Sequence, residues 1–110
     1  MPRPRIARQF DVVVNPAARV RRQLPYLVVL QSDFADTGDE RVVAPLSPVS
    51  EFKPATQRLF PTVALEGTAY RLLVPGLATA RVGSLMQPVG SLASERDRII
   101  AALDYLFLGF

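Results

Sequence analysis

Short apolar runs, each closed by turn-forming residues, occupy most of the chain. Runs that are rich in β-branched residues and bounded by Asn, Asp, Gly or Pro predict strands. On this criterion we expect strands at Phe10–Val14, Pro25–Gln31, Arg41–Ala44, Phe60–Glu66 and Ala69–Val74, and a weaker strand at Ala80–Leu85. Several consecutive short strands favour a mostly antiparallel, barrel-like sheet.

The apolar runs and the segments between them differ in character. Pro25–Gln31 is almost continuously apolar, which is typical of a strand buried on both faces. Gly67-Thr68 separates two apolar runs, a spacing typical of a tight β-hairpin. We interpret Ala17–Leu24 as a charged loop, Ser32–Asp39 as a loop whose side chains bond their own backbone, and Pro45–Pro54 as an irregular connection.

The C-terminal segment changes to helical periodicity. Ser94 and Asp97 fit a capping box, in which the serine hydroxyl accepts a hydrogen bond from the Asp97 amide. One stripe of the helix, facing the core or a second subunit, then contains Ile99, Leu103, Leu106 and Phe110, flanked by Ile100 and Phe107. The pattern therefore predicts an α+β domain that ends in a helix.

Leu108 lies outside this stripe, beside Asp97 and Asp104 on the polar side of the helix. Single exposed apolar residues are common, and chain termini fray. The alternative interpretation is an apolar tip that docks into a partner. Gly109 suits both interpretations, because a glycine loosens the last turn and lets Phe110 turn aside.

Composition restricts the chemistry. A chain of 110 residues, 49% of them hydrophobic, builds one domain and leaves much surface open, which favours a dimer. The sequence has no cysteine and no histidine, which excludes disulfides, thiolate zinc sites, cysteine nucleophiles and histidine acid–base catalysis. Most of the usual catalytic groups are therefore missing from the chain, and we expect no metal site and no cofactor.

Twelve arginines and one lysine against ten acids give a net charge of +3. A basic domain suits nucleic acid or an acidic protein segment. The arginines are not interleaved with aromatic residues, so we expect no direct nucleic-acid binding. Residues 1–8, with alternating Pro and Arg, predict a solvated arm before a domain at 9–110. Arg19, Arg21 and Arg22 form a candidate contact for an acidic partner segment, the alternative being a solvated loop.

Neither end of the chain predicts membrane insertion. Ile99–Phe110 is only twelve residues long and contains Asp104, so it is too short to span a bilayer. Phe10–Val14 is broken by Asp11 and is too short for the apolar part of a signal peptide. We expect a cytoplasmic protein that makes no contact with membranes.

Four short segments carry the most specific signal in the chain. They are Leu30-Gln31-Ser32-Asp33 with Asp36-Thr37, Val43-Ala44-Pro45-Leu46, Leu59-Phe60-Pro61 and the ending Phe107-Leu108-Gly109-Phe110. In order and spacing they resemble the CcdB toxins of bacterial toxin–antitoxin modules, over a stretch from Gln9 to Phe110. The resemblance implies a homodimer with an SH3-like antiparallel β-barrel and a C-terminal α-helix, a fold shared with the MazF-type ribonuclease toxins.

The resemblance also implies a function in a type II toxin–antitoxin module, such as those that maintain plasmids. CcdB toxins are not enzymes: they insert the tips of their paired C-terminal helices into the DNA gyrase A subunit dimer and trap the cleaved complex. A CcdA antitoxin with an acidic, disordered segment neutralises them. The positions that correspond to the gyrase contacts are Phe34, Ala35, Asp104, Phe107, Leu108, Gly109 and Phe110. The apolar stripe supplies candidate dimer contacts at Ile99, Leu103 and Leu106.

The tip departs from the family's ending of Phe, Trp, Gly and Ile. Phe107 and Gly109 match it, Leu108 replaces Trp, and Phe110 replaces Ile. Tryptophan is enriched among binding hot spots and leucine is under-represented there. Losing a buried indole costs about 2–4 kcal/mol, by analogy with truncations in protein cores. An alternative function is therefore a non-toxic CcdB homologue that binds the antitoxin but does not poison gyrase.

A MazF-like endoribonuclease is a further alternative. Arg71 on a strand, with Thr68 or Ser32 nearby, has the chemistry to stabilise a phosphorane, although an ordinary strand arginine is the stronger explanation. Asp33 and Asp36 have the chemistry of a magnesium pair, but such residues in a loop more often form turns. The chain contains no glycine-rich phosphate loop.

Overall fold

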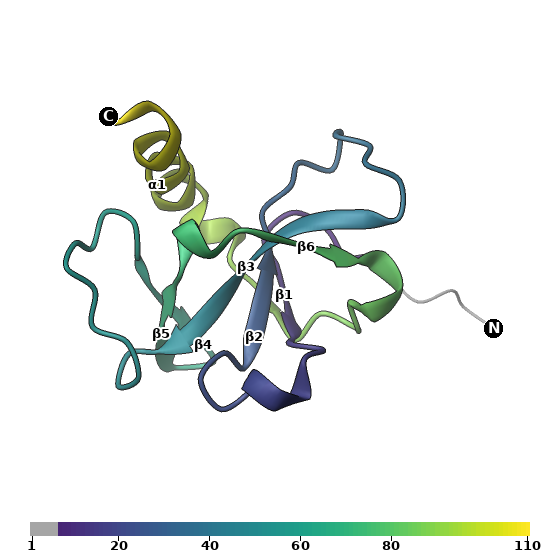
Figure 1. Cartoon of the computed structure of the whole chain (residues 1–110), viewed down its shortest axis with the longest axis horizontal. Coiled ribbons are helices and arrows are strands. Elements are labelled where there is room, and N and C mark those ends of the chain that lie inside the picture. The colour runs from purple at the N-terminus through teal and green to yellow at the C-terminus, as the bar shows by residue number, and fades with distance from the viewer. Residues whose placement is uncertain (1–6) are drawn as a thin grey trace.

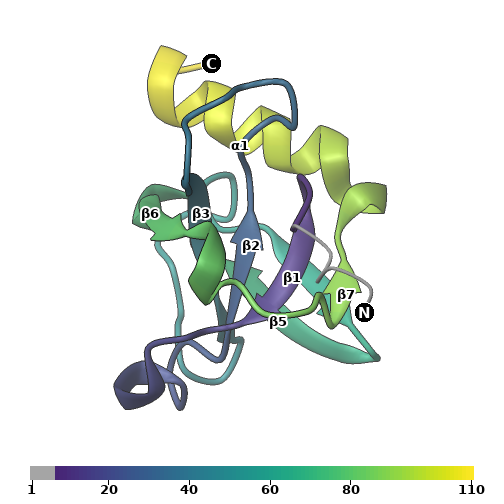
Figure 2. The same ribbon diagram turned by 90° about the vertical axis from the view of Figure 1, so that its right-hand side faces the viewer.

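The computed structural model describes residues 7–110, a bent antiparallel sheet crossed by one helix (Figure 1). The strands are β1 (Asp11–Val14), β2 (Tyr26–Val29), β3 (Glu40–Pro48), β4 (Thr62–Leu65), β5 (Thr68–Leu72), β6 (Ala78–Arg81) and β7 (Gly90–Ser91). The helix is α1 (Arg96–Leu108), which lies across the top of the strands in Figure 2. Short 3₁₀ turns at Ala18–Val20, Val74–Gly76, Val82–Ser84 and Ala93–Glu95 connect these elements.

The sheet curls until its two ends meet. Its strand order is β4-β5-β3-β2-β1-β7, and β6 pairs with the first part of β3. At the two ends of this order, Leu65 of β4 lies against Gly90 of β7, so close that a Cβ on Gly90 would stand 2.5 Å from Leu65 Cδ1. The result is a nearly closed antiparallel barrel with one C-terminal helix, which confirms the predicted α+β fold.

Both faces of the central strands are buried. In β2, Val28 belongs to the main core while its neighbour Val29 belongs to a second, smaller core. Neither is more than 1% exposed, so the prediction of a strand buried on both faces is confirmed. Ile99 and Ala102 of α1 close the main core. Ala7 is 5% exposed in the second core, so this residue was wrongly assigned to a solvated arm; residues 1–6 lie outside the described part.

The prediction that Pro45 ends the third strand is wrong, because β3 continues to Pro48. Proline lacks an N–H but keeps its carbonyl acceptor. The Pro45 carbonyl accepts a hydrogen bond from the Leu73 amide at 2.9 Å, and Leu46 pairs with strands on both sides, Tyr26 in β2 and Leu72 in β5. Pairing with two neighbours therefore outweighs the local signal, and the irregular connection begins only after Pro48.

Two further predicted elements differ in the structure, and one short strand was not predicted. The weaker strand, expected at Ala80–Leu85, is β6, which stops at Arg81 because its last partner is Glu40, the first residue of β3. The two-residue strand β7, which pairs with β1, is too short to give a pattern in the sequence. The charged loop before β2 contains a 3₁₀ turn.

The predicted capping box does not form. Ser94 lies inside a 3₁₀ turn, and within residues 7–110 no side chain caps the start of α1. The Ser91 hydroxyl instead accepts a hydrogen bond from the Ala93 amide at 3.1 Å. Because Leu92 is drawn into the core with 2% exposure, the chain enters the helix through this tighter turn.

The hairpin between β4 and β5 turns at Glu66–Gly67, one residue earlier than predicted. Leu65 pairs with Thr68, and the two turn residues have φ angles of 51° and 81°. Positive φ at both central residues defines a type I′ turn, which favours Asn-Gly. Glu66 therefore occupies a conformation that suits asparagine better than glutamate.

Replacing Glu66 with asparagine is expected to raise the free energy of unfolding by about 0.5–1 kcal/mol, because asparagine tolerates positive φ. Urea denaturation of the two proteins measures the difference. Glu66→Gln removes the charge without relieving the backbone, and is expected to leave stability unchanged. An equal gain in both variants would show that the charge, not the conformation, is responsible.

Candidate functional site

The C-terminal end of α1 is an apolar tip, which we define as Phe107, Leu108, Gly109 and Phe110. Its three large side chains are 68%, 60% and 80% exposed, in chain order. Gly109 ends the helix with φ 81° and ψ 9°, and its amide donates a hydrogen bond to the Tyr105 carbonyl at 3.0 Å. This left-handed residue turns the chain aside, so Phe110 leaves the stripe on which the sequence placed it and lies in solvent.

The body of the helix anchors the tip. Ile99 is fully buried in the main core, and Leu103 and Leu106 pack against the same core with part of their surface exposed. The predicted stripe therefore faces the core of its own chain. Ile99 has no side-chain surface left for the dimer contact predicted there, whereas Leu103 and Leu106 retain some. The helix continues to Leu108, two residues beyond Leu106, the last of these core contacts, which is why the tip projects.

The other predicted gyrase contacts are exposed at the same end of the molecule. Phe34 is 99% exposed in the loop that joins β2 to β3, and Ala35 beside it is exposed as well. Both views show this loop and the end of α1 on the upper side, separated across it in Figure 1. Asp104 is exposed on α1 itself. The tip and the loop therefore form two projections of one face.

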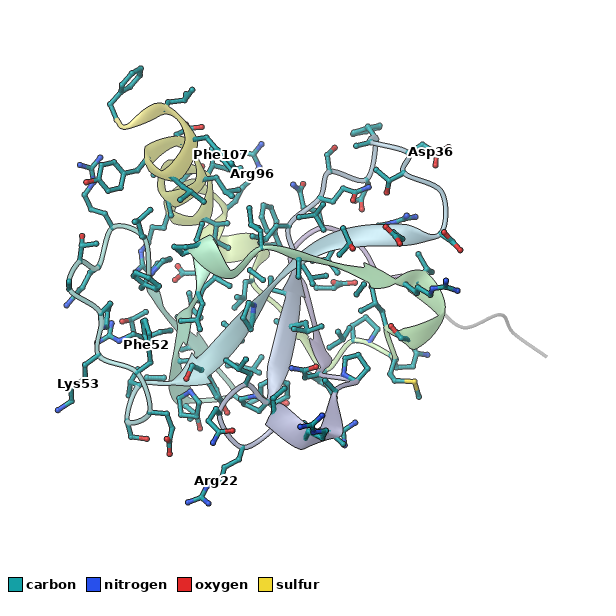
Figure 3. The ribbon with its side chains drawn as sticks, in the orientation of Figure 1. Arg22, Asp36, Phe52, Lys53, Arg96 and Phe107 are labelled. Atoms are coloured by element: carbon teal, nitrogen blue, oxygen red, sulfur yellow. The ribbon has the colours of Figure 1, made fainter. Side chains whose placement is uncertain are left out.

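The charged loop that contains Arg19, Arg21 and Arg22 lies at the end of the molecule opposite the tip, as the labels of Arg22 and Phe107 show in Figure 3. Arg19, Arg21 and Arg22 are all exposed. The Arg21 Nε donates a hydrogen bond to the Asn15 carbonyl at 2.6 Å, so Arg21 braces its own loop. Arg19 and Arg22 present their charge to solvent.

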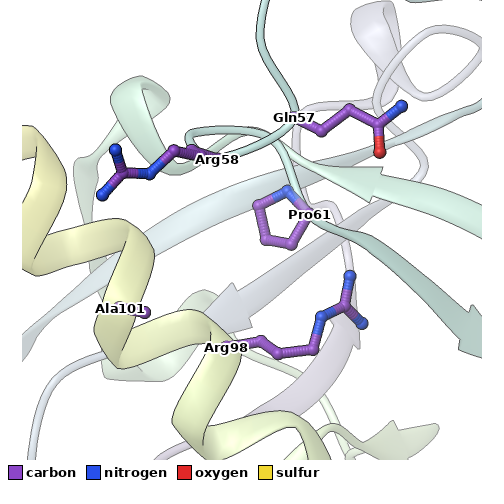
Figure 4. A pocket seen from close by; sticks show the side chains of 5 residues that line it. All are labelled: Gln57, Arg58, Pro61, Arg98 and Ala101. Atoms are coloured by element: carbon purple, nitrogen blue, oxygen red, sulfur yellow. The ribbon is translucent and has the colours of Figure 1, made fainter.

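A pocket of about 190 Å³ opens between α1 and the chain before β4 (Figure 4). It is lined by Gln57, Arg58, Pro61, Arg98 and Ala101. The guanidinium of Arg58 lies 3.7 Å from the ring centroid of Tyr105, and Arg98 forms an ion pair with Glu95. Arg58 is thus engaged with Tyr105 of α1, and Arg98 with Glu95 in the turn before α1. The five lining residues include no nucleophile and no general acid or base.

The residues considered for ribonuclease activity have structural partners. Arg71 donates from Nε to the Phe52 carbonyl at 3.1 Å and from Nη1 to the Thr62 hydroxyl at 2.8 Å. The Ser32 hydroxyl accepts a hydrogen bond from the Phe34 amide at 3.1 Å. Thr68 is exposed at the start of β5, next to the hairpin turn. These contacts describe Arg71 as a strand arginine that holds the long connection before β4.

The two loop aspartates have structural partners: Asp33 bonds a residue 24 positions earlier, and Asp36 forms a local turn. Asp33 Oδ1 accepts a hydrogen bond from the Gln9 amide, and Asp36 Oδ1 accepts one from the Gly38 amide, both at 2.9 Å. Within residues 7–110 no three acidic side chains gather as metal ligands would. Among the same residues, no helix combines the length and the apolar character that crossing a bilayer requires.

Tyr26 and Tyr70 pack edge to face on the barrel, with ring centroids 5.6 Å apart. Burial, and then the neighbouring Tyr26, raise the pKa of Tyr70 above its ordinary value. The pair joins β2 to β5, so its role is to hold the barrel together.

The comparisons with known proteins agree with this architecture. No curated protein matches the chain. The family model described as CcdB protein matches residues 9–109, which is nearly the whole chain. That span includes the barrel, the exposed loop and the helix up to Gly109, and so the chain belongs to the CcdB family.

Proposed function

We propose that the chain is the toxin of a type II toxin–antitoxin module, which binds the A subunit of DNA gyrase and traps its complex with cleaved DNA. Proteins of the CcdB family are gyrase poisons rather than enzymes. The observation that carries the proposal is the apolar tip, whose three large side chains are 60–80% exposed beyond the last buried turn of an anchored helix. Removing such side chains from water in a partner's pocket drives association.

Trapping requires preferential binding rather than catalysis. A ligand shifts a conformational equilibrium only by its difference in affinity for the two states. In this proposal, the helix tip enters between the two A subunits once they have separated around cleaved DNA. Binding there stabilises the open complex and opposes religation. In a homodimer, whose mass is twice 12.1 kDa, two tips act together.

Phe34, Ala35 and Asp104 supply supporting contacts on the same face. The loop places the Phe34 side chain beside the surface of gyrase that receives the tip. There it helps to exclude water from the buried contacts. The antitoxin contacts the opposite end through an acidic segment, which pairs with Arg19 and Arg22. Their exposure and the net charge of +3 support this assignment.

One observation favours a second function. Leu108 stands where the family has tryptophan, and a leucine presents a smaller apolar surface to a hot-spot pocket. If this tip does not bind gyrase, the chain still binds an antitoxin through Arg19 and Arg22 at its opposite end. It would then act as a non-toxic homologue that competes for the antitoxin.

A cleavage assay distinguishes these functions. The purified protein is incubated with DNA gyrase, ATP and supercoiled plasmid, and with single-stranded RNA in parallel. Linear plasmid after denaturation is the expected result. Cut RNA without linear plasmid would establish the ribonuclease instead. With neither product, the non-toxic homologue would be the better description, and antitoxin binding would be measured next.

A further inference from the structure

The side chain of Gln31 holds the loop that carries Phe34. Gln31 ends the apolar run of β2 and is only 9% exposed. Its Nε2 donates hydrogen bonds to the Ala35 carbonyl at 2.7 Å and to the Thr37 hydroxyl at 2.9 Å. Its Oε1 accepts one from the Val42 amide at 2.9 Å. One buried amide thus ties two points of the loop to the first part of β3.

The rest of the loop is braced in the same way. The Thr37 hydroxyl donates to the Glu40 carbonyl at 2.6 Å, and the Asp33 and Ser32 side chains accept hydrogen bonds from backbone amides. Phe34 is nevertheless 99% exposed, so within the described part of the chain nothing covers its ring. The position of this ring is set by the loop backbone and not by packing.

We infer that Gln31 is a positioning residue for partner binding, which preorganises the β2–β3 loop so that Phe34 meets the partner without loss of conformational freedom. This inference rests on the proposed function, with the gyrase A subunit as the partner. A loop ordered in advance avoids the entropy cost of ordering on binding.

Asn15 provides a matched control at the opposite end. It is 5% exposed, and its amide also braces a loop: Nδ2 donates to the Leu24 carbonyl, and Oδ1 accepts from the Ala17 amide, both at 2.9 Å. Gln31→Glu and Asn15→Asp each keep the acceptor oxygen, lose the donor and add one negative charge. They therefore perturb the two loops alike.

The first measurement follows backbone order by ¹⁵N relaxation and amide exchange in the whole protein. Gln31→Glu is expected to loosen residues 32–39 while the barrel keeps its protection, and Asn15→Asp to loosen residues 16–24 instead. A loop at 32–39 that stays as ordered as in the parent overturns the inference. This result does not depend on gyrase, so it tests whether Gln31 orders the loop even if the parent chain fails to bind gyrase and the proposed function falls.

The second measurement is a double-mutant cycle on affinity for a purified gyrase A fragment. Gln31→Glu is expected to weaken binding about tenfold in the parent and less than about threefold in a Phe34→Ala background, because the two residues act through one contact. Asn15→Asp is expected to change affinity less than about twofold. Equal losses in both backgrounds would overturn the inference, since a general loss of fold or an added charge acts without Phe34.

Discussion

Leu108→Asp is expected to lower the affinity for the gyrase A subunit by at least about a hundredfold and to abolish trapping of cleaved DNA. The variant forces an unpaired carboxylate into an apolar contact, which costs about 3 kcal/mol or more. The fold tolerates the change because Leu108 is 60% exposed and follows the last buried turn of α1. Surface plasmon resonance with a gyrase A fragment, and plasmid linearisation, measure the two losses.

The control for this variant is Ala101→Asp, which adds the same charge at an exposed position two turns earlier on α1. It is expected to trap gyrase as the parent does.

The opposite change, Leu108→Trp, restores the family residue and is expected to tighten binding about tenfold or more. A folded Leu108→Asp variant that still linearises plasmid would remove the tip from the mechanism.

Ile99→Ala is expected to lower the free energy of unfolding by about 3–4 kcal/mol, the range for a large-to-small change in a tight core. Ile99 is fully buried where α1 closes the barrel, so its loss leaves a cavity between the helix and the sheet. For a domain of this size, such a loss lowers Tm by about 15 °C. Urea and thermal denaturation followed by circular dichroism measure both quantities.

The neighbouring residue provides the comparison. Ile100 has the same side chain but is only partly buried against the core. Ile100→Ala is therefore expected to cost about 1 kcal/mol. Similar losses in the two variants would mean that α1 does not pack on the barrel through Ile99. Because the tip depends on an anchored helix, Ile99→Ala is also expected to weaken gyrase binding at temperatures near its Tm.

The two pairs of variants separate the body of the helix from its tip. Changes at Ile99 act on stability first and on binding through stability. Changes at Leu108 act on binding and leave stability nearly unchanged. This division follows from burial alone, because Ile99 is fully buried and Leu108, on the same helix, is 60% exposed.

The class of the fold and the location of the candidate site could be predicted from the sequence. β-branched runs bounded by turn residues predict strands wherever local preference and burial agree, as at Val28 and Val29. Helical periodicity separated the buried Ile99 from Leu108, the residue outside its stripe. Both patterns are local, and they survive folding because burying apolar surface is the main driving force.

Other features were decided only by tertiary structure. β3 continues past Pro45 because strands pair with it on both edges. β6 ends at Arg81, whose partner is Glu40, the first residue of β3. Ser94 does not take the capping role that the sequence predicts, because Leu92 is buried and the chain enters α1 through a 3₁₀ turn. The bracing of the Phe34 loop by Gln31 joins residues up to eleven positions apart. In each case the partner lies far along the chain or across the core, so local preferences of about 1 kcal/mol yield to contacts that only the folded chain provides.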